Sequence, residues 1–320
     1  PRPDAGADAA LMSAIALLGP QFREPNLAPV LAELGLEGPL VSITAGWQER
    51  EGEIDELAAH LGREVTDLAL YQRTEDIFAD DRQLFRAYRS RQDRLHGMQS
   101  LYRVQLEHAS SAVLDVWNHE GEPSIRRAAR RSALGVMRRL DREHLLAIER
   151  VHEDFARRVV LTERKSVAPH RNELARLIGE AGAVLIAGGH VAILANRLRF
   201  LGFAGLLQGK AVLAWSAGAM AISERIVLFH DQPPQGPGVP ELFDQGLGLV
   251  PGVLPLPHAQ TRLHLHDREH VSILARRFAP QHCMTLDHGS VVSYVDGRPA
   301  GDANSWRLTR DGTLAEGNTA

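Results

Sequence analysis

Apolar residues in the first eighty positions follow two different spacings in turn. Short apolar runs at 12–18, 40–44 and 65–70 predict buried strands, whereas three- and four-residue spacing over 26–34 and 49–61 predicts amphipathic helices. Strands that alternate with helices through short connections are typical of βαβ units around a parallel sheet. The pattern therefore predicts an α/β fold with a doubly wound, mostly parallel sheet.

The pattern changes at Asp81. From Leu84 to Val116 apolar residues recur at helical spacing without a break, and a second such run extends from Met137 to Val159. The polar stretch between the two runs contains Gly121 and Pro123 and has the length of a helix–helix connection. Residues 81–166 are therefore predicted to form a long helical hairpin.

Beyond Pro169 strand and helix signals alternate again. We expect strands at 183–187, 211–215, 226–229 and 247–256, and helices at 171–181, 191–201 and 268–278. A terminal strand pair is expected around 284–286 and 291–295, with a turn at Asp296-Gly297. Residues 1–80 and 167–320 would thus form one α/β domain into which the hairpin is inserted.

Composition restricts the class of protein. The 320 residues carry a formal charge of −4, which gives no general attraction to nucleic acid or to an anionic membrane. Cys283 is the single cysteine, so an intramolecular disulfide and a multi-cysteine zinc site are excluded. The sequence shows no signal-peptide pattern and no apolar run long enough to span a membrane. We expect a cytoplasmic protein with neither a nucleic-acid nor a membrane partner.

The charges of the hairpin leave two interpretations open. Its second helix opens with Arg126, Arg127, Arg130 and Arg131, and acidic residues follow at 141, 143, 149, 153 and 154. Mixed charge of this kind favours a solvated face that packs on its own partner helix or on a second subunit. The hairpin is thus a candidate surface for homo-oligomerisation, with binding of an acidic partner as the alternative.

Candidate chemistry is concentrated at 211–220, where an apolar strand leads into Ser216 and then into small residues. A serine on such a strand-to-helix turn presents its hydroxyl, and the small residues Ala217, Gly218 and Ala219 allow the backbone to turn close to a substrate. The simpler interpretation is that Ser216 only caps the following helix.

A second strand, VLIA at 184–187, ends in Gly188-Gly189. Parallel strands end at the same edge of a sheet, where sites of this class collect. The backbone N–H groups of Gly188, Gly189 and Ala217 are therefore candidates for an oxyanion hole, although paired glycines also mark ordinary turns.

A serine nucleophile needs a neutral imidazole as general base and a carboxylate to orient that imidazole. We predict His258 as the base and Asp231 as the acid. His258 follows an apolar strand whose prolines restrict the backbone in front of it. His230 and Glu224 are the nearest substitutes for these roles. Because the chain has 15 histidines, a structural or surface role for His258 is the alternative.

These segments, taken together, resemble the peptidase E and cyanophycinase family of serine peptidases, which has a flavodoxin-like fold of the class I glutamine amidotransferase type. The resemblance rests on WSAGA at 215–219, the preceding strand that ends in Gly-Gly, GLGLVPGVLPLPH at 246–258 and LDHGSVVSYVDG at 286–297. It implies that Ser216 is the nucleophile, His258 the base and Asp231 the acid, and it covers most of the chain outside the hairpin.

The same resemblance implies roles for residues around the triad. Arg262 and Arg268 fall where the family carries arginines, and a guanidinium suits a substrate carboxylate. His190 stands where the family continues its glycine turn with other residues, and we include it among the candidate substrate contacts. His288 replaces the acidic residue of the cyanophycinase branch, and the hairpin matches neither branch.

The sequence gives less support to two other kinds of site, a metal site and a glutaminase site. His264, His266 and His270 could share a metal, but no carboxylate or cysteine motif completes the site, so we predict no metal and no cofactor. A glutaminase of this fold would need a cysteine where Ser216 stands.

The sequence therefore predicts a cofactor-independent serine hydrolase that cleaves small peptide or isopeptide amide bonds. If Arg262 or Arg268 holds a substrate carboxylate, bonds next to an acidic residue are favoured. A catalytically inactive scaffold that acts through the hairpin, as an interaction or oligomerisation module, is the alternative.

Overall fold

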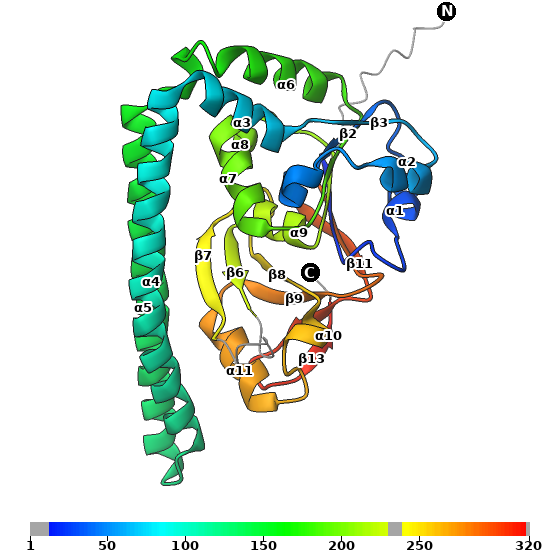
Figure 1. Cartoon of the computed structure of the whole chain (residues 1–320). Coiled ribbons are helices and arrows are strands. Elements are labelled where there is room, and N and C mark those ends of the chain that lie inside the picture. The colour runs from blue at the N-terminus through cyan, green and yellow to red at the C-terminus, as the bar shows by residue number, and fades with distance from the viewer. Residues whose placement is uncertain (1–12, 230–238, 318–320) are drawn as a thin grey trace, which may run out of the picture.

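The central sheet of the protein has five parallel strands and two antiparallel ones. In the computed structural model, which describes residues 13–229 and 239–317, the strand order is β11-β10-β1-β5-β4-β2-β3. The parallel strands pair in register β1 with β5, β5 with β4, β4 with β2 and β2 with β3. This confirms the predicted α/β fold with a mostly parallel sheet (Figure 1). The strands are β1 (Ala14–Leu18), β2 (Leu40–Ile43), β3 (Val65–Asp67), β4 (Ala183–Ile186), β5 (Val212–Trp215), β10 (Val291–Val295) and β11 (Arg298–Ala303).

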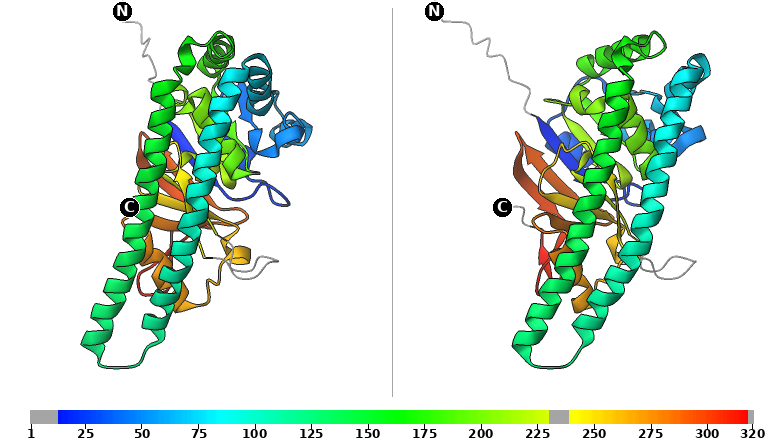
Figure 2. Two further views of the ribbon diagram at one scale, coloured as in Figure 1. Left: turned by 60° about the vertical axis from the view of Figure 1, so that its left-hand side comes forward. Right: turned by 90° about the vertical axis from the view of Figure 1, so that its left-hand side faces the viewer.

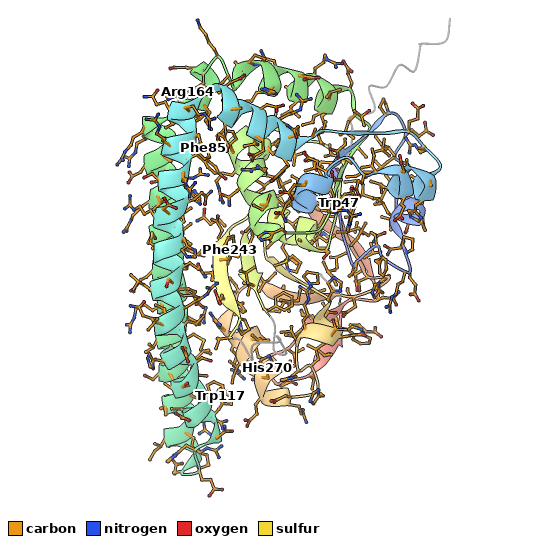
Figure 3. All side chains as sticks on the ribbon, in the orientation of Figure 1. Trp47, Phe85, Trp117, Arg164, Phe243 and His270 are labelled. Carbon is orange, nitrogen blue, oxygen red and sulfur yellow. The ribbon has the colours of Figure 1, made fainter. Side chains whose placement is uncertain are left out.

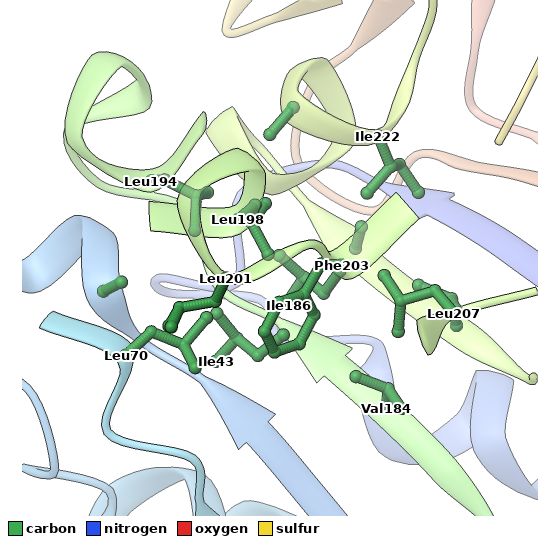
Figure 4. Packing of buried hydrophobic residues seen from close by; sticks show 14 of the residues in the cluster. Ile43, Leu70, Val184, Ile186, Leu194, Leu198, Leu201, Phe203, Leu207 and Ile222 are labelled. Atoms are coloured by element: carbon green, nitrogen blue, oxygen red, sulfur yellow. The ribbon is translucent and has the colours of Figure 1, made fainter. Parts of the chain in front are cut away.

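Both faces of this sheet are covered, because successive side chains of a strand point to opposite sides. Ile15 and Leu17 of β1 belong to one apolar cluster, whereas Ala16 and Leu18 belong to another. The second cluster packs under α1 (Leu27–Glu33) and α2 (Asp55–Leu61). Figure 4 shows the first cluster from close by. The helices over the first cluster are α3 (Leu70–Asp80), α6 (Ala168–Glu180), α7 (Val191–Leu201), α8 (Phe203–Leu206) and α9 (Ala217–Ile222).

Of the described strands that follow β5, only β10 and β11 join this sheet. Among the described residues, four strands form a second sheet in the order β13-β12-β9-β8, and two more form a ribbon, β6 with β7. The helices α10 (Ala259–Arg262) and α11 (Arg268–Arg277) follow β8. These strands are β6 (Arg225–Leu228), β7 (Glu241–Gln245), β8 (Val253–Pro257), β9 (His282–Leu286), β12 (Trp306–Leu308) and β13 (Leu314–Glu316).

Three local expectations are wrong. The predicted terminal pair does not form, since β9 pairs with β8 and β12 while β10 pairs with β1 and β11. The turn at Asp296-Gly297 is confirmed; it joins β10 to β11 with positive φ at both residues. The predicted helix over 49–61 is broken around Gly52 (φ 87°), between η1 (Ala45–Arg50) and α2. The run at 65–70 is a strand only to Asp67, because α3 begins at Leu70.

The helical hairpin is confirmed. Helices α4 (Arg82–Asn118) and α5 (Pro123–Arg158) lie side by side along the body and end in a loop beyond it (Figure 2). The side chain of Asp81 caps α4 by accepting a hydrogen bond from the N–H of Leu84 (2.8 Å), and Pro123 occupies the first turn of α5. After the hairpin the chain passes through η2 (Leu161–Glu163) into α6. Among the described residues, no helix combines the length and apolar character that crossing a membrane requires.

The hairpin is packed into both halves of the body. Its base contributes Tyr88 and Phe155 to the core of the central sheet, and its outer half contributes Tyr102 and Met137 to the core of the second sheet. The boundaries of a separate inserted unit at 81 and 166 stay a prediction, because the hairpin shares both of these cores.

Candidate active site

Ser216 is the first residue after β5, and its backbone is strained. Its φ and ψ of 52° and −119° lie in a region that non-glycine residues rarely adopt. The conformation is held from both sides, since the N–H of Ser216 donates to the carbonyl oxygen of Leu18 (3.0 Å) and its carbonyl accepts from the N–H of Met220 (3.3 Å). Strain of this kind costs on the order of 1–3 kcal/mol and is typical of functional turns.

The small residues around Ser216 are required by close backbone contacts. A Cβ on Gly188 would lie 3.0 Å from the Cβ of Ser216, and a Cβ on Gly218 would collide with the carbonyl oxygen of Ile186. The turn after β4 therefore packs directly against the turn after β5. This confirms that the two strand ends lie at one edge of the sheet.

Three backbone N–H groups at this edge are available as donors. Those of Gly188, Gly189 and Ala217 donate no hydrogen bond to another described residue. The loop that carries two of them is fixed by a hydrogen bond from the N–H of His190 to the carbonyl oxygen of Gly46 (2.8 Å) and by the left-handed φ of Gly189 (106°). Such fixed, unpaired donors are what an oxyanion hole needs.

His258 is the first residue after β8, so it comes from the second sheet. It has a left-handed backbone (φ 58°, ψ 34°), and its N–H donates to the carbonyl oxygen of Leu286 on β9 (3.1 Å). Burial, together with the charges of Arg262 and His288, lowers the pKa of His258 to about 4. Its imidazole is therefore neutral at pH 7 and can accept a proton.

One cavity brings the main candidates together. Ser216, His258, Gly188 and Gly189 all line a cavity of about 600 Å³ at the C-terminal ends of the parallel strands. Trp47, labelled in Figure 3, lines the same cavity. The wall is largely apolar, with charges from one arginine and two glutamates. The remaining lining residues are Pro20, Gln21, Phe22, Arg23, Pro25, Leu27, Glu53, Glu56, Leu57, His60 and Trp215.

The predicted substrate contacts lie outside this lining. The ring of His190 caps α7 by accepting a hydrogen bond from the N–H of Ile193 (3.4 Å), and Arg268 is exposed at the start of α11. Arg262 is half-buried on α10, near enough to His258 to affect its pKa.

The predicted acid, Asp231, and its neighbour His230 lie outside the described residues. The substitute Glu224 accepts hydrogen bonds from Gln281 (2.5 Å) and from the N–H of Gly252 (3.2 Å), and it does not line the cavity.

Sequence reasoning missed Asp287, whose carboxyl group lies against the turn that carries His258. Its Oδ1 accepts a hydrogen bond from the N–H of Gln260 (3.0 Å), while its Oδ2 is buried without a partner among the described residues. Burial raises the pKa of this carboxyl group. Its place follows from strand register, since Pro257 pairs with Leu286 and His258 and Asp287 are therefore the next residues on two adjacent parallel strands.

The other candidate chemistries find no support in the described residues. His264 has its ring centroid 5.8 Å from that of His266 and 6.2 Å from that of His270, and no group of three or more possible ligands in the described ranges could hold a metal ion. Cys283 is fully buried on β9, and burial raises its pKa to about 12, so it is not a nucleophile.

Comparison with known proteins shows a family and two solved structures to which this chain is similar. No curated protein sequence matches the chain. A peptidase from an acI-B1 Actinobacterium has a solved structure that is 14% identical, with a TM-score of 0.46, over 94% of this chain and 93% of its own. A candidate peptidase E protein from Listeria monocytogenes EGD-e is 13% identical, with a TM-score of 0.43, over 93% of this chain and 100% of its own.

The model of peptidase family S51 matches residues 144–299. The matched segment contains the strands and turns that carry Gly188, Ser216, His258 and Asp287. Over this segment the chain is similar to peptidase family S51.

Proposed function

We propose that this protein is a serine peptidase that cleaves small peptide or isopeptide amide bonds with Ser216 as nucleophile and His258 as general base. The observation that carries the proposal is the shared cavity, in which a strained serine, an imidazole with a depressed pKa and two unpaired backbone donors meet. The match of residues 144–299 to the model of peptidase family S51 supports the same chemistry.

The proposed reaction has two halves. The Oγ of Ser216 attacks the amide carbonyl while His258 takes its proton, and the N–H groups of Gly189 and Ala217 stabilise the oxyanion. His258 then gives the proton to the leaving amine, which departs with formation of an acyl-enzyme. A water molecule, deprotonated by His258, attacks the ester, and His258 returns this proton to the Oγ of Ser216 as the acid is released.

Asp231 is proposed to orient His258, from the sequence resemblance alone. We propose that the substrate carries a carboxylate beside the scissile bond, because Arg262 lies next to His258 and Arg23 lines the cavity. Aspartyl dipeptides, isoaspartyl dipeptides and cyanophycin-like polymers are therefore the first substrates to screen; cleavage of the polymer would assign the cyanophycinase branch.

Covalent labelling with a fluorophosphonate tests the nucleophile. We expect stoichiometric label on the wild-type protein and none on Ser216→Ala, with Ser223→Ala as a matched control that keeps its label, because Ser223 is fully buried and bonded to the carbonyl of Met220 (2.8 Å). A wild-type protein that stays unlabelled over the whole accessible pH range would favour the inactive scaffold instead.

A further inference from the structure

A second cavity, of about 610 Å³, lies between the outer half of the hairpin and α11, and it is lined by six arginines. No carboxylate is among the described residues that line it. It shares no residue with the cavity of Ser216; Trp117 marks its place on the hairpin and Trp47 that of the first cavity in Figure 3. The arginines are Arg127, Arg130, Arg131, Arg138, Arg276 and Arg310.

Three of these guanidinium groups are held in place by neutral groups. Arg130 donates to the carbonyl oxygen of Trp117 and lies over its ring, 5.3 Å from the centroid. Arg138 donates to the carbonyl oxygen of Ala279 (2.7 Å), and Arg276 to that of Arg310 (3.0 Å). Because a carbonyl accepts a hydrogen bond without neutralising charge, these contacts orient the cations and leave both their charge and further N–H donors available.

The side chains of Arg127, Arg131 and Arg310 make no hydrogen bond or ion pair with any described residue, although each lines the cavity. Some arginines outside this cavity are neutralised by carboxylates. Among described residues Arg277 pairs with Asp141 (2.8 Å) and Arg199 with Asp244 (2.6 Å). Six uncompensated guanidinium groups around one cavity repel one another, and a bound anion would remove that repulsion.

We propose that this cavity binds a compact polyanion, a small molecule that carries two or more phosphate groups. Its volume is that of a small-ligand site, and guanidinium groups bind phosphate oxygens in bidentate fashion. A single-stranded nucleic acid would need aromatic faces on which bases can stack, whereas the ring of Trp117 is already covered by Arg130. An acidic peptide places fewer charges in the same volume than neighbouring phosphate groups do.

Titration calorimetry of the full chain with inorganic tripolyphosphate tests the proposal. We expect saturable binding of one equivalent that weakens as salt is added, and a dissociation constant raised at least about tenfold in the double variant Arg127→Gln/Arg131→Gln. The matched control is Arg150→Gln/Arg158→Gln, which removes the same charge from exposed positions of the same helix outside the cavity and is expected to keep wild-type affinity. All four arginines are exposed, and their side chains make no hydrogen bond or ion pair with a described residue. We therefore expect both double variants to fold.

Three outcomes would overturn the proposal. The first is no saturable binding at low ionic strength. The second is equal loss in both double variants, which would reduce the effect to net charge. The third is tighter binding of a single-stranded oligonucleotide or of a polyglutamate peptide than of tripolyphosphate, with loss of that binding in Arg127→Gln/Arg131→Gln, which would assign the cavity to a polymer.

Discussion

Ser216 and His258 both have a positive φ (52° and 58°), which is uncommon for residues other than glycine, although their ψ angles differ. Each is the first residue after a buried strand, where the chain must turn sharply into a short helix. At Ser216 the hydrogen bond to Leu18 fixes the turn, and at His258 the hydrogen bond to Leu286 does so. The strain in both residues is therefore borne by neighbouring strands, which keeps the two side chains at the wall of one cavity.

The depressed pKa of His258 predicts the acid limb of the pH profile. Because the pKa is lowered from 6.5 to about 4, the base stays neutral as pH falls and becomes protonated only near 4. We expect kcat/KM for a cleaved peptide to lose half its value near pH 4 to 5, whereas an ordinary histidine would give a midpoint near 6.5.

Stability must be measured over the same pH range. Burial also lowers the pKa of His144 to about 4, so the unfolded chain takes up its proton first and the free energy of unfolding falls as pH drops from about 6.5 to 4. Unfolding curves at each pH separate this loss from the loss of activity. A midpoint near 6.5 in fully folded protein would contradict the assignment of a buried, neutral base.

Asp287 is expected to act as a positioning residue, since its Oδ1 holds the N–H of Gln260 in the turn after His258. Asp287→Ala removes this acceptor and should lower kcat about tenfold with little change in KM. Asp287→Asn keeps an oxygen acceptor and should stay near wild type. If both variants lose activity equally, the negative charge is what matters, and Asp287 rather than Asp231 would be the orienting acid.

Strand ends explain which parts of the site could be predicted from the sequence. The turns at Gly188-Gly189 and at Ser216 are encoded locally, as an apolar run followed by small residues, so their identity and shared edge could be predicted. The position of Asp287 depends on the register between β8 and β9, which single-sequence patterns do not specify.

The division of the strands between two sheets could not be predicted for a related reason. An apolar run such as 253–257 has the same pattern in either sheet, and only tertiary packing assigns β8 and β9 to the second one.

Close packing of the two turns predicts the effect of one added methyl group. In Gly188→Ala the new Cβ would stand 3.0 Å from the Cβ of Ser216, so the nucleophile must shift by a few tenths of an ångström. We expect kcat to fall about tenfold while the melting temperature changes little. Gly205→Ala is the matched control, because nothing lies within 4 Å of its Cβ. Unchanged kcat in Gly188→Ala would show that the nucleophile needs no such precise placement.

Catalysis requires a fixed position of the second sheet relative to the central sheet. Ser216 follows a strand of the central sheet, whereas His258 follows a strand of the second sheet. The hairpin contributes to this, since its base packs in the core of the central sheet and its outer half in the core of the second. Its strongest polar anchor is Asp141 of α5, which pairs with the buried Arg277 of α11 (2.8 Å) and accepts a hydrogen bond from Tyr102 (2.7 Å).

Breaking this anchor should therefore affect both stability and catalysis. In Asp141→Asn the guanidinium of Arg277, whose side chain is 2% exposed, would lose its charged partner, and the free energy of unfolding should fall by about 3–5 kcal/mol. If the hairpin also fixes the two sheets, kcat measured well below the melting temperature should fall severalfold although the protein is fully folded. Glu180→Gln, which breaks the exposed Arg176–Glu180 pair, should change neither quantity appreciably. A destabilised Asp141→Asn protein with wild-type kcat would restrict the hairpin to a stabilising role, and the relation between Ser216 and His258 would then be set by the contacts of α9 and β6 with β8.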